Sequence, residues 1–204
     1  MEKILFVTVL WLGWCSLHSL LICDPIKDQI IRRSPLTASC YRLGYVLFST
    51  VTLIPLALFT HLQPQKVLFT WHGPYHIIQA GLALYSGLLF IAGGRAYDLP
   101  YFLGLRQLLH SRMGFKDQAQ FHTNGILGLV RHPWYSGGIA LLWCVSPITD
   151  MSLSVRLLLS LYFVAGSYLE EKRLVREIGP SYLLYQKQVP MLIPNWSSLL
   201  RTRR

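Results

Sequence analysis

Three apolar runs of about twenty residues occupy most of the first half of the chain. They cover residues 4–23, 41–62 and 76–94. A helix needs about 20 apolar residues to cross the hydrocarbon core of a bilayer. The backbone of a spanning segment must also satisfy its own polar groups, which in lipid only a helix or a closed barrel can do. The three runs therefore predict three membrane-spanning helices.

Composition favours a membrane protein over a soluble one. The chain is 52% hydrophobic and only 14% charged, whereas soluble domains carry about 25% charged residues. The formal net charge of +10 raises the alternative of nucleic acid binding. The cations, however, lie beside the apolar runs rather than on one amphipathic face, so membrane orientation explains them better. We therefore expect a lipid bilayer, and no nucleic acid, as partner.

The second half of the chain predicts a shorter helical hairpin. Residues 134–148 are apolar but too few for a full span, and residues 153–169 return after a turn that contains Pro147 and Asp150. Gly179 and Pro180 stop the returning helix, and residues 181–189 form a short helix at the membrane surface.

The expected fold is thus an all-α integral membrane helical bundle with about five transmembrane segments and a cytoplasmic carboxy-terminal interfacial helix. We expect a single domain over residues 1–204. Within it, residues 1–94 form an amino-terminal three-span bundle, and residues 125–194 form the hairpin and the carboxy-terminal motif.

The distribution of cations predicts the orientation of the chain. Segments 24–42, 95–131 and 170–204 hold four, five and seven of the 19 lysines and arginines. The remaining three, Lys3, Lys66 and Arg156, fall on the other side of the membrane if the chain crosses it five times. Because cytoplasmic segments are rich in Lys and Arg, we expect the amino terminus outside and the carboxy terminus in the cytoplasm. A multi-pass protein of a bacterial inner membrane fits this pattern.

Two polar clusters then share the cytoplasmic face. Arg131 and His132 precede Pro133, whose fixed φ and missing N–H suit the first turn of a helix. Glu170 and Glu171 end the apolar run of the returning helix. Arg131 can also serve as a simple membrane anchor, and the two glutamates as a solvated helix end. The combination of an Arg-His-Pro segment with two adjacent carboxylates favours a functional site.

The cysteines and the histidine of the first run favour structural roles. Cys15, Cys23, Cys40 and Cys144 form no C-x-x-C pair and lie in or beside apolar runs, which indicates buried thiols rather than a metal site. We expect His18 to make a hydrogen bond between helices.

The polar clusters belong to a longer pattern that resembles a known family. Gly125, Arg131, His132, Pro133 and Tyr135 are followed by Glu170, Glu171 and Leu174, and then by Gly179, Tyr182, Tyr185, Val189, Pro190 and Pro194. This pattern resembles the isoprenylcysteine carboxyl methyltransferase superfamily, which includes phospholipid methyltransferases. The amino-terminal half, with Leu17-His18-Ser19-Leu20 and Tyr41-Arg42-Leu43, is similar to a bacterial branch that includes methanethiol methyltransferases and NnrU-type proteins.

The resemblance implies a membrane methyltransferase that uses S-adenosylmethionine. It implies that the cofactor binds between the hairpin and the carboxy-terminal segment. The cofactor-binding residues would be His132, Tyr135, Gly137, Glu170, Glu171, Leu174, Tyr182 and Tyr185, and the catalytic residues Arg131 and His132. Carboxylates can pair with the ammonium group or ribose of the cofactor, Arg131 or His132 can hold its carboxylate, and aromatic rings can flank its adenine or sulfonium.

The methyl acceptor stays open between a hydrophobic molecule and a small thiol or carboxyl compound, which would enter from the lipid. Arg131 would orient a carboxylate acceptor, whereas His132 or a glutamate would take the proton of a thiol. Two other functions also stay open. One is a non-catalytic membrane accessory protein of the NnrU type. The other, less favoured, is an NADPH-dependent membrane reductase, since the reductases with a similar carboxy-terminal fold are longer chains with more spans.

Overall fold

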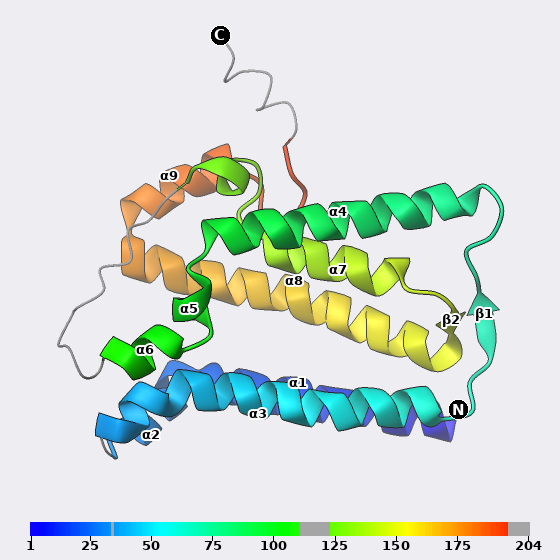
Figure 1. Cartoon of the computed structure of the whole chain (residues 1–204), viewed down its shortest axis with the longest axis horizontal. Helices are drawn as coiled ribbons and strands as arrows, with labels where there is room; N and C mark the ends of the chain where they lie inside the picture. The colour runs from blue at the N-terminus through cyan, green and yellow to red at the C-terminus, as the bar shows by residue number, and fades with distance from the viewer. Residues whose placement is uncertain (34, 111–122, 196–204) are drawn as a thin grey trace, which may run out of the picture. The chain divides into compact units, whose positions relative to one another are not determined.

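The structure is a computed structural model, and it describes residues 1–33, 35–110 and 123–195 (Figure 1). Within these ranges the regular structure is helical except for two short paired strands, β1 (Val67–Phe69) and β2 (Ile148–Thr149). Four of the described helices are long and apolar enough to cross a membrane, namely Glu2–Ile22, Ala38–Leu62, Tyr75–Ala96 and Asp150–Ile178. The expectation of an all-α integral membrane bundle is therefore confirmed.

The chain forms two compact units. The first contains Met1–Lys66, Asp98–Gln118 and Thr149–Val155, and the second contains Val67–Tyr97, Ala119–Ile148 and Arg156–Arg204. The helix of the third apolar run thus belongs to the same unit as the hairpin. The organisation as a single domain stays a prediction.

The first unit is built on two long helices, α1 (Glu2–Ile22) and α3 (Pro35–Leu62), which run side by side (Figure 1). The short helix α2 (Asp24–Ile31) connects them. Two further short helices, α5 (Leu99–Phe102) and α6 (Leu105–His110), belong to the same unit.

Polar side chains join α1 to α3 within their apolar surfaces. The indole of Trp11 donates a hydrogen bond to the Thr60 hydroxyl over 3.0 Å. His18 lies 3.1 Å from the Ser49 hydroxyl through Nδ1 and 2.7 Å from the Tyr45 hydroxyl through Nε2. Hydrogen bonds between apolar helices fix their rotation, because water is not present to replace them. The interhelical role predicted for His18 is confirmed.

The second unit contains the third apolar helix and the hairpin. Its helices are α4 (Tyr75–Ala96), the 3₁₀ turn η1 (Gly125–Gly128), α7 (Pro133–Cys144), most of α8 (Asp150–Ile178) and α9 (Pro180–Gln188). Pro133 is the first residue of α7, as predicted from its fixed φ.

Helices α4 and α7 approach each other closely at two glycines. A Cβ added at Gly93 would lie 2.6 Å from the Trp134 ring, and one at Gly137 would lie 3.3 Å from the Ser86 carbonyl oxygen. The Ser86 hydroxyl in turn donates to the Gly137 carbonyl over 2.8 Å. Gly137 therefore lies in the seam between α4 and α7, where a larger residue would push the helices apart.

The short fifth segment is a helix continued by non-helical chain. Helix α7 has 12 residues, which span about 18 Å at 1.5 Å per residue. From Val145 the chain runs on without helix through β2 to Asp150. The prediction that this segment is too short for a helical span is confirmed.

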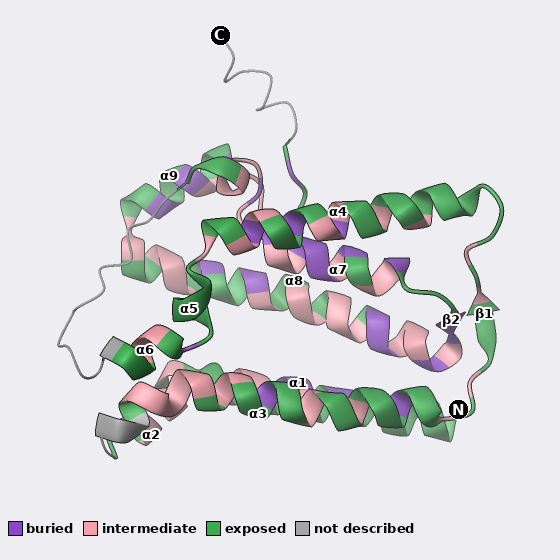
Figure 2. Cartoon of the chain, in the orientation of Figure 1, coloured by how far each residue is buried: buried purple, intermediate pink, exposed green. Residues whose placement is uncertain are grey.

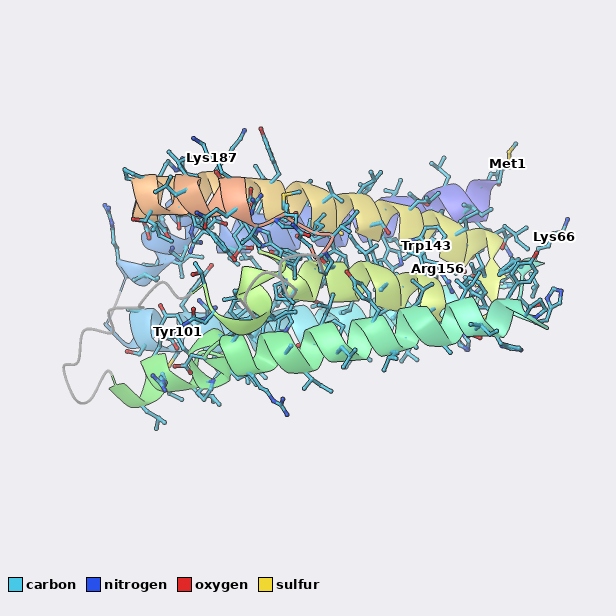
Figure 3. The ribbon with its side chains drawn as sticks, turned by 90° about the horizontal axis from the view of Figure 1, so that it is seen from above. Met1, Lys66, Tyr101, Trp143, Arg156 and Lys187 are labelled. Carbon is cyan, nitrogen blue, oxygen red and sulfur yellow. The ribbon has the colours of Figure 1, made fainter. Side chains whose placement is uncertain are left out.

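Arg156 satisfies the exposed carbonyls of this non-helical stretch. Its Nη1 donates to the carbonyl of Val145 over 2.8 Å, and its Nη2 donates to that of Pro147 over 3.1 Å. Arg156 is only 5% exposed, and it lies near Trp143 at the turn end of the hairpin (Figure 3). Irregular backbone is tolerated at membrane depth only where protein groups satisfy it. The structure therefore places Arg156 inside the hairpin, where it acts as a brace.

Helix α8 continues well beyond the apolar run. It has 29 residues and ends at Ile178. Its last turns are polar and include an ion pair between Arg173 and Glu177 over 2.9 Å. Gly179 then adopts a φ of +77° and α9 begins at Pro180. The predicted stop at Gly179-Pro180 and the following short helix are confirmed.

Much of the surface of the long helices is exposed (Figure 2), and large hydrophobic side chains are among the exposed residues. Leu5, Ile54, Ile77 and Leu161, one from each of the four long helices, are all more than half exposed. Large contiguous apolar surfaces are rare on soluble proteins, and here lipid would cover them. Among the cysteines, Cys15 and Cys144 are buried, which confirms that part of the expectation, whereas Cys23 is exposed.

Candidate functional site

The two predicted polar clusters meet in the second unit through an ion pair. The Nε of Arg131 lies 2.5 Å from Oε1 of Glu171, and its Nη2 lies 2.9 Å from Oε2. Arg131 comes from the segment that leads into α7, and Glu171 comes from the polar end of α8. Both side chains are less than a tenth exposed. The two-pronged geometry matches the guanidinium fork to the carboxylate, which gives a strong and directional pair.

The rest of the Arg131 guanidinium holds the end of α9. Its Nη1 donates to the carbonyl oxygens of Gln186 and Val189 over 2.7 Å and 2.6 Å. The side-chain amide of Gln186 donates to Glu171 over 2.9 Å. Arg131 thus connects three segments that are distant in sequence. The carboxylate that fills its fork here belongs to Glu171, so this part of the guanidinium does not face outward to a ligand.

Main-chain hydrogen bonds fix the same region. The amides of Arg131 and His132 donate to the carbonyls of Pro190 and Met191 over 3.0 Å and 3.1 Å. The segment before α7 therefore pairs with the segment after α9. The residues of the Arg-His-Pro motif and of the carboxy-terminal motif, which the sequence analysis treats as one pattern, are in direct contact.

His132 lies between the two glutamates. It is 4% exposed. Its Nε2 is 3.2 Å from Glu171 Oε1, and its Nδ1 is 3.8 Å from Glu170 Oε2. Burial lowers the pKa of His132 below its ordinary range, although the charges of Glu170 and Glu171 oppose this shift. One ring nitrogen of His132 thus lies within hydrogen-bond distance of Glu171, and the other faces the Glu170 carboxylate.

Glu170 differs from Glu171 in exposure and in partners. Its side chain is 43% exposed, against 8% for Glu171. The Tyr135 ring lies 5.4 Å from the His132 ring between centroids. Of the two adjacent glutamates, Glu170 is therefore the one whose carboxylate is open to a ligand.

Tyr97 belongs to this group although the sequence analysis does not select it. It follows the last turn of α4, and its hydroxyl lies 3.5 Å from the Arg131 carbonyl. Its ring meets that of Trp134 edge to face, with 4.8 Å between centroids. Burial raises the pKa of Tyr97, and the nearby charge of Glu170 adds to the shift. An aromatic residue at the end of an apolar run is its only sequence signal, and that signal is common.

Three other residues predicted to line a pocket form a small core instead. Tyr182 and Tyr185 of α9 are 2% and 6% exposed and cluster with Val189. Leu174 of α8 packs against this cluster. Burial raises the pKa of Tyr185 to about 12, with Arg131 opposing the shift. Its hydroxyl donates to the Leu127 carbonyl over 2.5 Å. These residues hold α9 on α8 and support the site from behind.

The arrangement brings together an open carboxylate, an imidazole and two aromatic hydroxyls. Nδ1 of His132 and Oε2 of Glu170 are 3.8 Å apart, which is too far for a direct hydrogen bond. A ligand that carries an ammonium or hydroxyl group could donate to the exposed Glu170 carboxylate. Within the described ranges, no group of three or more His, Cys, Asp or Glu residues could hold a metal ion.

The chain is similar to several bacterial enzymes of one kind. It is 29% identical over 203 residues to methanethiol S-methyltransferase 2 of Bradyrhizobium diazoefficiens, which covers 98% of the chain and 77% of the relative. It is 32% identical over 168 residues to methanethiol S-methyltransferase of Pseudomonas deceptionensis, covering 80% and 63%. A further Pseudomonas methanethiol S-methyltransferase is 35% identical over 92 residues, covering 45% and 35%.

In two of these three relatives the matched region is less than two thirds of the relative's own length. No protein-family model matches the chain, and no solved structure matches it. The motifs and the similarity over nearly the whole chain nevertheless agree. The chain is thus similar, over nearly its whole length, to bacterial methanethiol S-methyltransferases.

Proposed function

We propose that the chain is a membrane methyltransferase that uses S-adenosylmethionine and methylates a small thiol such as methanethiol. The observation that carries this proposal is the similarity to a methanethiol S-methyltransferase over 98% of the chain, which spans both polar clusters. The local geometry supports it, because these clusters form one site in the second unit.

The residues around Glu170 fit this cofactor. Its ammonium group needs an accessible carboxylate, and Glu170 is exposed where Glu171 is not. The ammonium or a ribose hydroxyl would donate to this exposed carboxylate. The rings of Tyr97 and Tyr135 can lie against a cationic sulfonium. When bound, S-adenosylmethionine supplies an activated methyl group.

His132 is the proposed base for a thiol acceptor. A thiol must lose its proton before its sulfur becomes a strong nucleophile. Nδ1 of the neutral His132 can accept that proton, while Nε2–H stays bonded to Glu171. Glu171 fixes the ring and stabilises the charge that the ring gains, and Arg131 fixes Glu171. Arg131 is therefore proposed as a positioning residue rather than as a direct ligand.

The surroundings suit a small apolar acceptor. The helices of the second unit expose apolar side chains to lipid, and methyl acceptors of this kind partition into lipid. We infer from the cation distribution that the amino terminus lies outside and the carboxy terminus in the cytoplasm of a bacterial inner membrane. The site then faces the compartment that contains the water-soluble cofactor.

The direct test measures product from purified protein in lipid nanodiscs. The protein is supplied with S-adenosylmethionine labelled in its methyl group and with methanethiol, and labelled dimethyl sulfide is measured in the headspace. We expect product in wild type and at least tenfold less with His132→Asn. Cofactor binding without product for any thiol or carboxyl acceptor would contradict the proposal and favour the accessory function.

A further inference from the structure

A second polar feature lies on another face of α8 from Glu170. A cleft of about 470 Å³ between α8 and α9 is lined by Tyr168, Glu171, Lys172, Val175, Arg176 and Gln186. Successive residues of a helix are about 100° apart. Glu170 and Glu177 therefore lie on the side of α8 opposite Tyr168 and Lys172. The cleft is thus separate from the open carboxylate of the proposed methyltransferase site.

The cleft is positively charged. Lys172 and Arg176 are four residues apart on one face of α8, and both are exposed. Neither forms a salt bridge with a carboxylate in the ranges that the structure describes. Among the six lining residues the only carboxylate is Glu171, which is 6% exposed and already paired with Arg131. An anion that entered this cleft would meet two cations and no exposed negative charge.

An apolar stripe leads along α8 into the cleft. Leu157, Leu161 and Val164 are 50%, 71% and 41% exposed, and Tyr168 follows at 56%. Their spacing of four, three and four residues puts them on one face of the helix. Lys172 continues this face, with its Nζ 4.7 Å from the centroid of the Tyr168 ring. The stripe thus runs directly from lipid-facing residues to the two cations.

We propose that this cleft binds the phosphate of an anionic phospholipid. Lys172 and Arg176 hold the phosphate, and the acyl chains lie along Leu157, Leu161 and Val164. Basic sites at the end of a spanning helix recognise anionic headgroups in this way, because charge and apolar surface meet at the membrane boundary. A soluble phosphate would contact only the two cations, whereas a lipid would also contact the apolar stripe. The cleft should therefore bind the lipid more tightly.

The test compares ligands and matched variants of the full chain in detergent. Dihexanoyl phosphatidylglycerol, dihexanoyl phosphatidylcholine and inorganic phosphate are titrated, and binding is measured by native mass spectrometry and thermal shift. We expect phosphatidylglycerol to bind at least tenfold more tightly than either other ligand. Lys172→Gln/Arg176→Gln should weaken its binding about thirtyfold, since each cation near an anionic headgroup contributes about a fivefold factor.

The control is Arg95→Gln/Lys187→Gln, which removes the same charge from two residues outside the lining of the cleft, one on α4 and one on α9, and should change affinity less than twofold. An equal loss in both double variants would overturn the proposal in favour of general surface charge. Inorganic phosphate binding as tightly as phosphatidylglycerol would overturn the lipid assignment. Equal affinity for phosphatidylcholine would overturn recognition of negative charge.

Discussion

Arg131 and Glu171, forty positions apart in the chain, form a two-pronged ion pair with distances of 2.5 Å and 2.9 Å. The same guanidinium donates to the carbonyls of Gln186 and Val189. One side chain therefore joins the start of α7, the polar end of α8 and the end of α9. The pair also separates the roles of two adjacent glutamates, because Glu171 is buried and paired with Arg131, whereas the side chain of Glu170 is 43% exposed.

Replacing Arg131 by Lys should weaken both the fold and the activity. An ammonium group cannot reproduce the planar fork, so at least two of the four hydrogen bonds are lost. We expect the free energy of unfolding to fall by about 2 kcal/mol and methyl transfer to fall at least tenfold. Arg173→Lys is the control, because its pair with Glu177 is half exposed. Unchanged melting temperature and turnover in Arg131→Lys would reduce Arg131 to a membrane anchor.

The two glutamates should respond differently to the same substitution. Glu170→Gln should change the free energy of unfolding by less than about 0.5 kcal/mol but weaken S-adenosylmethionine binding about tenfold or more. Glu171→Gln leaves a buried guanidinium without its anion and should cost about 3 kcal/mol of stability. Calorimetric binding and thermal melts measure both effects, with Glu177→Gln as control. If Glu170→Gln binds the cofactor as wild type does, the assignment of the open carboxylate is wrong.

Acid should destabilise the protein through His132. Burial lowers the pKa of His132 in the folded state, while in the unfolded state it titrates near about 6.5. As pH falls below about 6.5, the His132 ring binds a proton in the unfolded state before it does so in the folded state. The contribution of the buried neutral ring to the free energy of unfolding is therefore complete above about pH 6.5 and declines below it. Melting temperatures from pH 8 to 5 should show this decline in wild type. A variant His132→Asn should show a smaller decline, and an equal slope in both would exclude His132 as its source.

Arg156 should matter for stability although it lies far from the polar clusters in sequence. Arg156→Met removes the donors to Val145 and Pro147. Each carbonyl left without a partner costs about 1–3 kcal/mol, so we expect a loss of about 3 kcal/mol. Arg173→Met, which removes an exposed guanidinium, should change stability by less than about 1 kcal/mol. Comparable melting temperatures for the two variants would argue against the brace.

Gly104 should resist substitution in the first unit. It has a φ of +84°, and an added Cβ would lie 2.5 Å from the Leu43 amide nitrogen. Gly104→Ala should therefore cost about 2 kcal/mol or more. Gly81→Ala is the matched control, since nothing lies within 4 Å of Gly81 and alanine is the better helix former. We expect Gly81→Ala to be neutral or stabilising in a thermal melt.

Sequence patterns were sufficient for the spanning helices but not for every helix end. Long apolar runs require helices in lipid, and the ends of α1 and α4 lie within two residues of their predicted spans. Helix α3, however, begins at Pro35 rather than at Tyr41, because a helix can start in the polar residues before an apolar run and Pro suits its first turn. Helix α8 continues to Ile178 because its polar turns still favour helix and Arg173 pairs with Glu177. The stop at Gly179-Pro180 was predictable because it depends on local backbone chemistry.

The partners within the site were less predictable. Sequence spacing shows that Arg131 can hold a carboxylate, but it does not show whether that carboxylate belongs to a ligand or to Glu171. Tyr97 carries no motif, and it joins the site only because α4 packs against α7. In the sequence, Arg156 is one cation among others. Its role depends on the carbonyls of Val145 and Pro147, which lie beyond the end of α7 at Cys144.

The links from Arg131 to Gln186 and Val189 have a consequence for biosynthesis. During translation the spanning helices, Arg131 and Glu171 are all made before the end of α9. Until Gln186 and Val189 emerge from the ribosome, the guanidinium lacks two of its acceptors and the segment after α9 cannot pair with the segment before α7. The nascent chain thus inserts into the membrane first and completes the site last. A chain truncated before residue 186 would therefore be anchored in the membrane but would have no finished site.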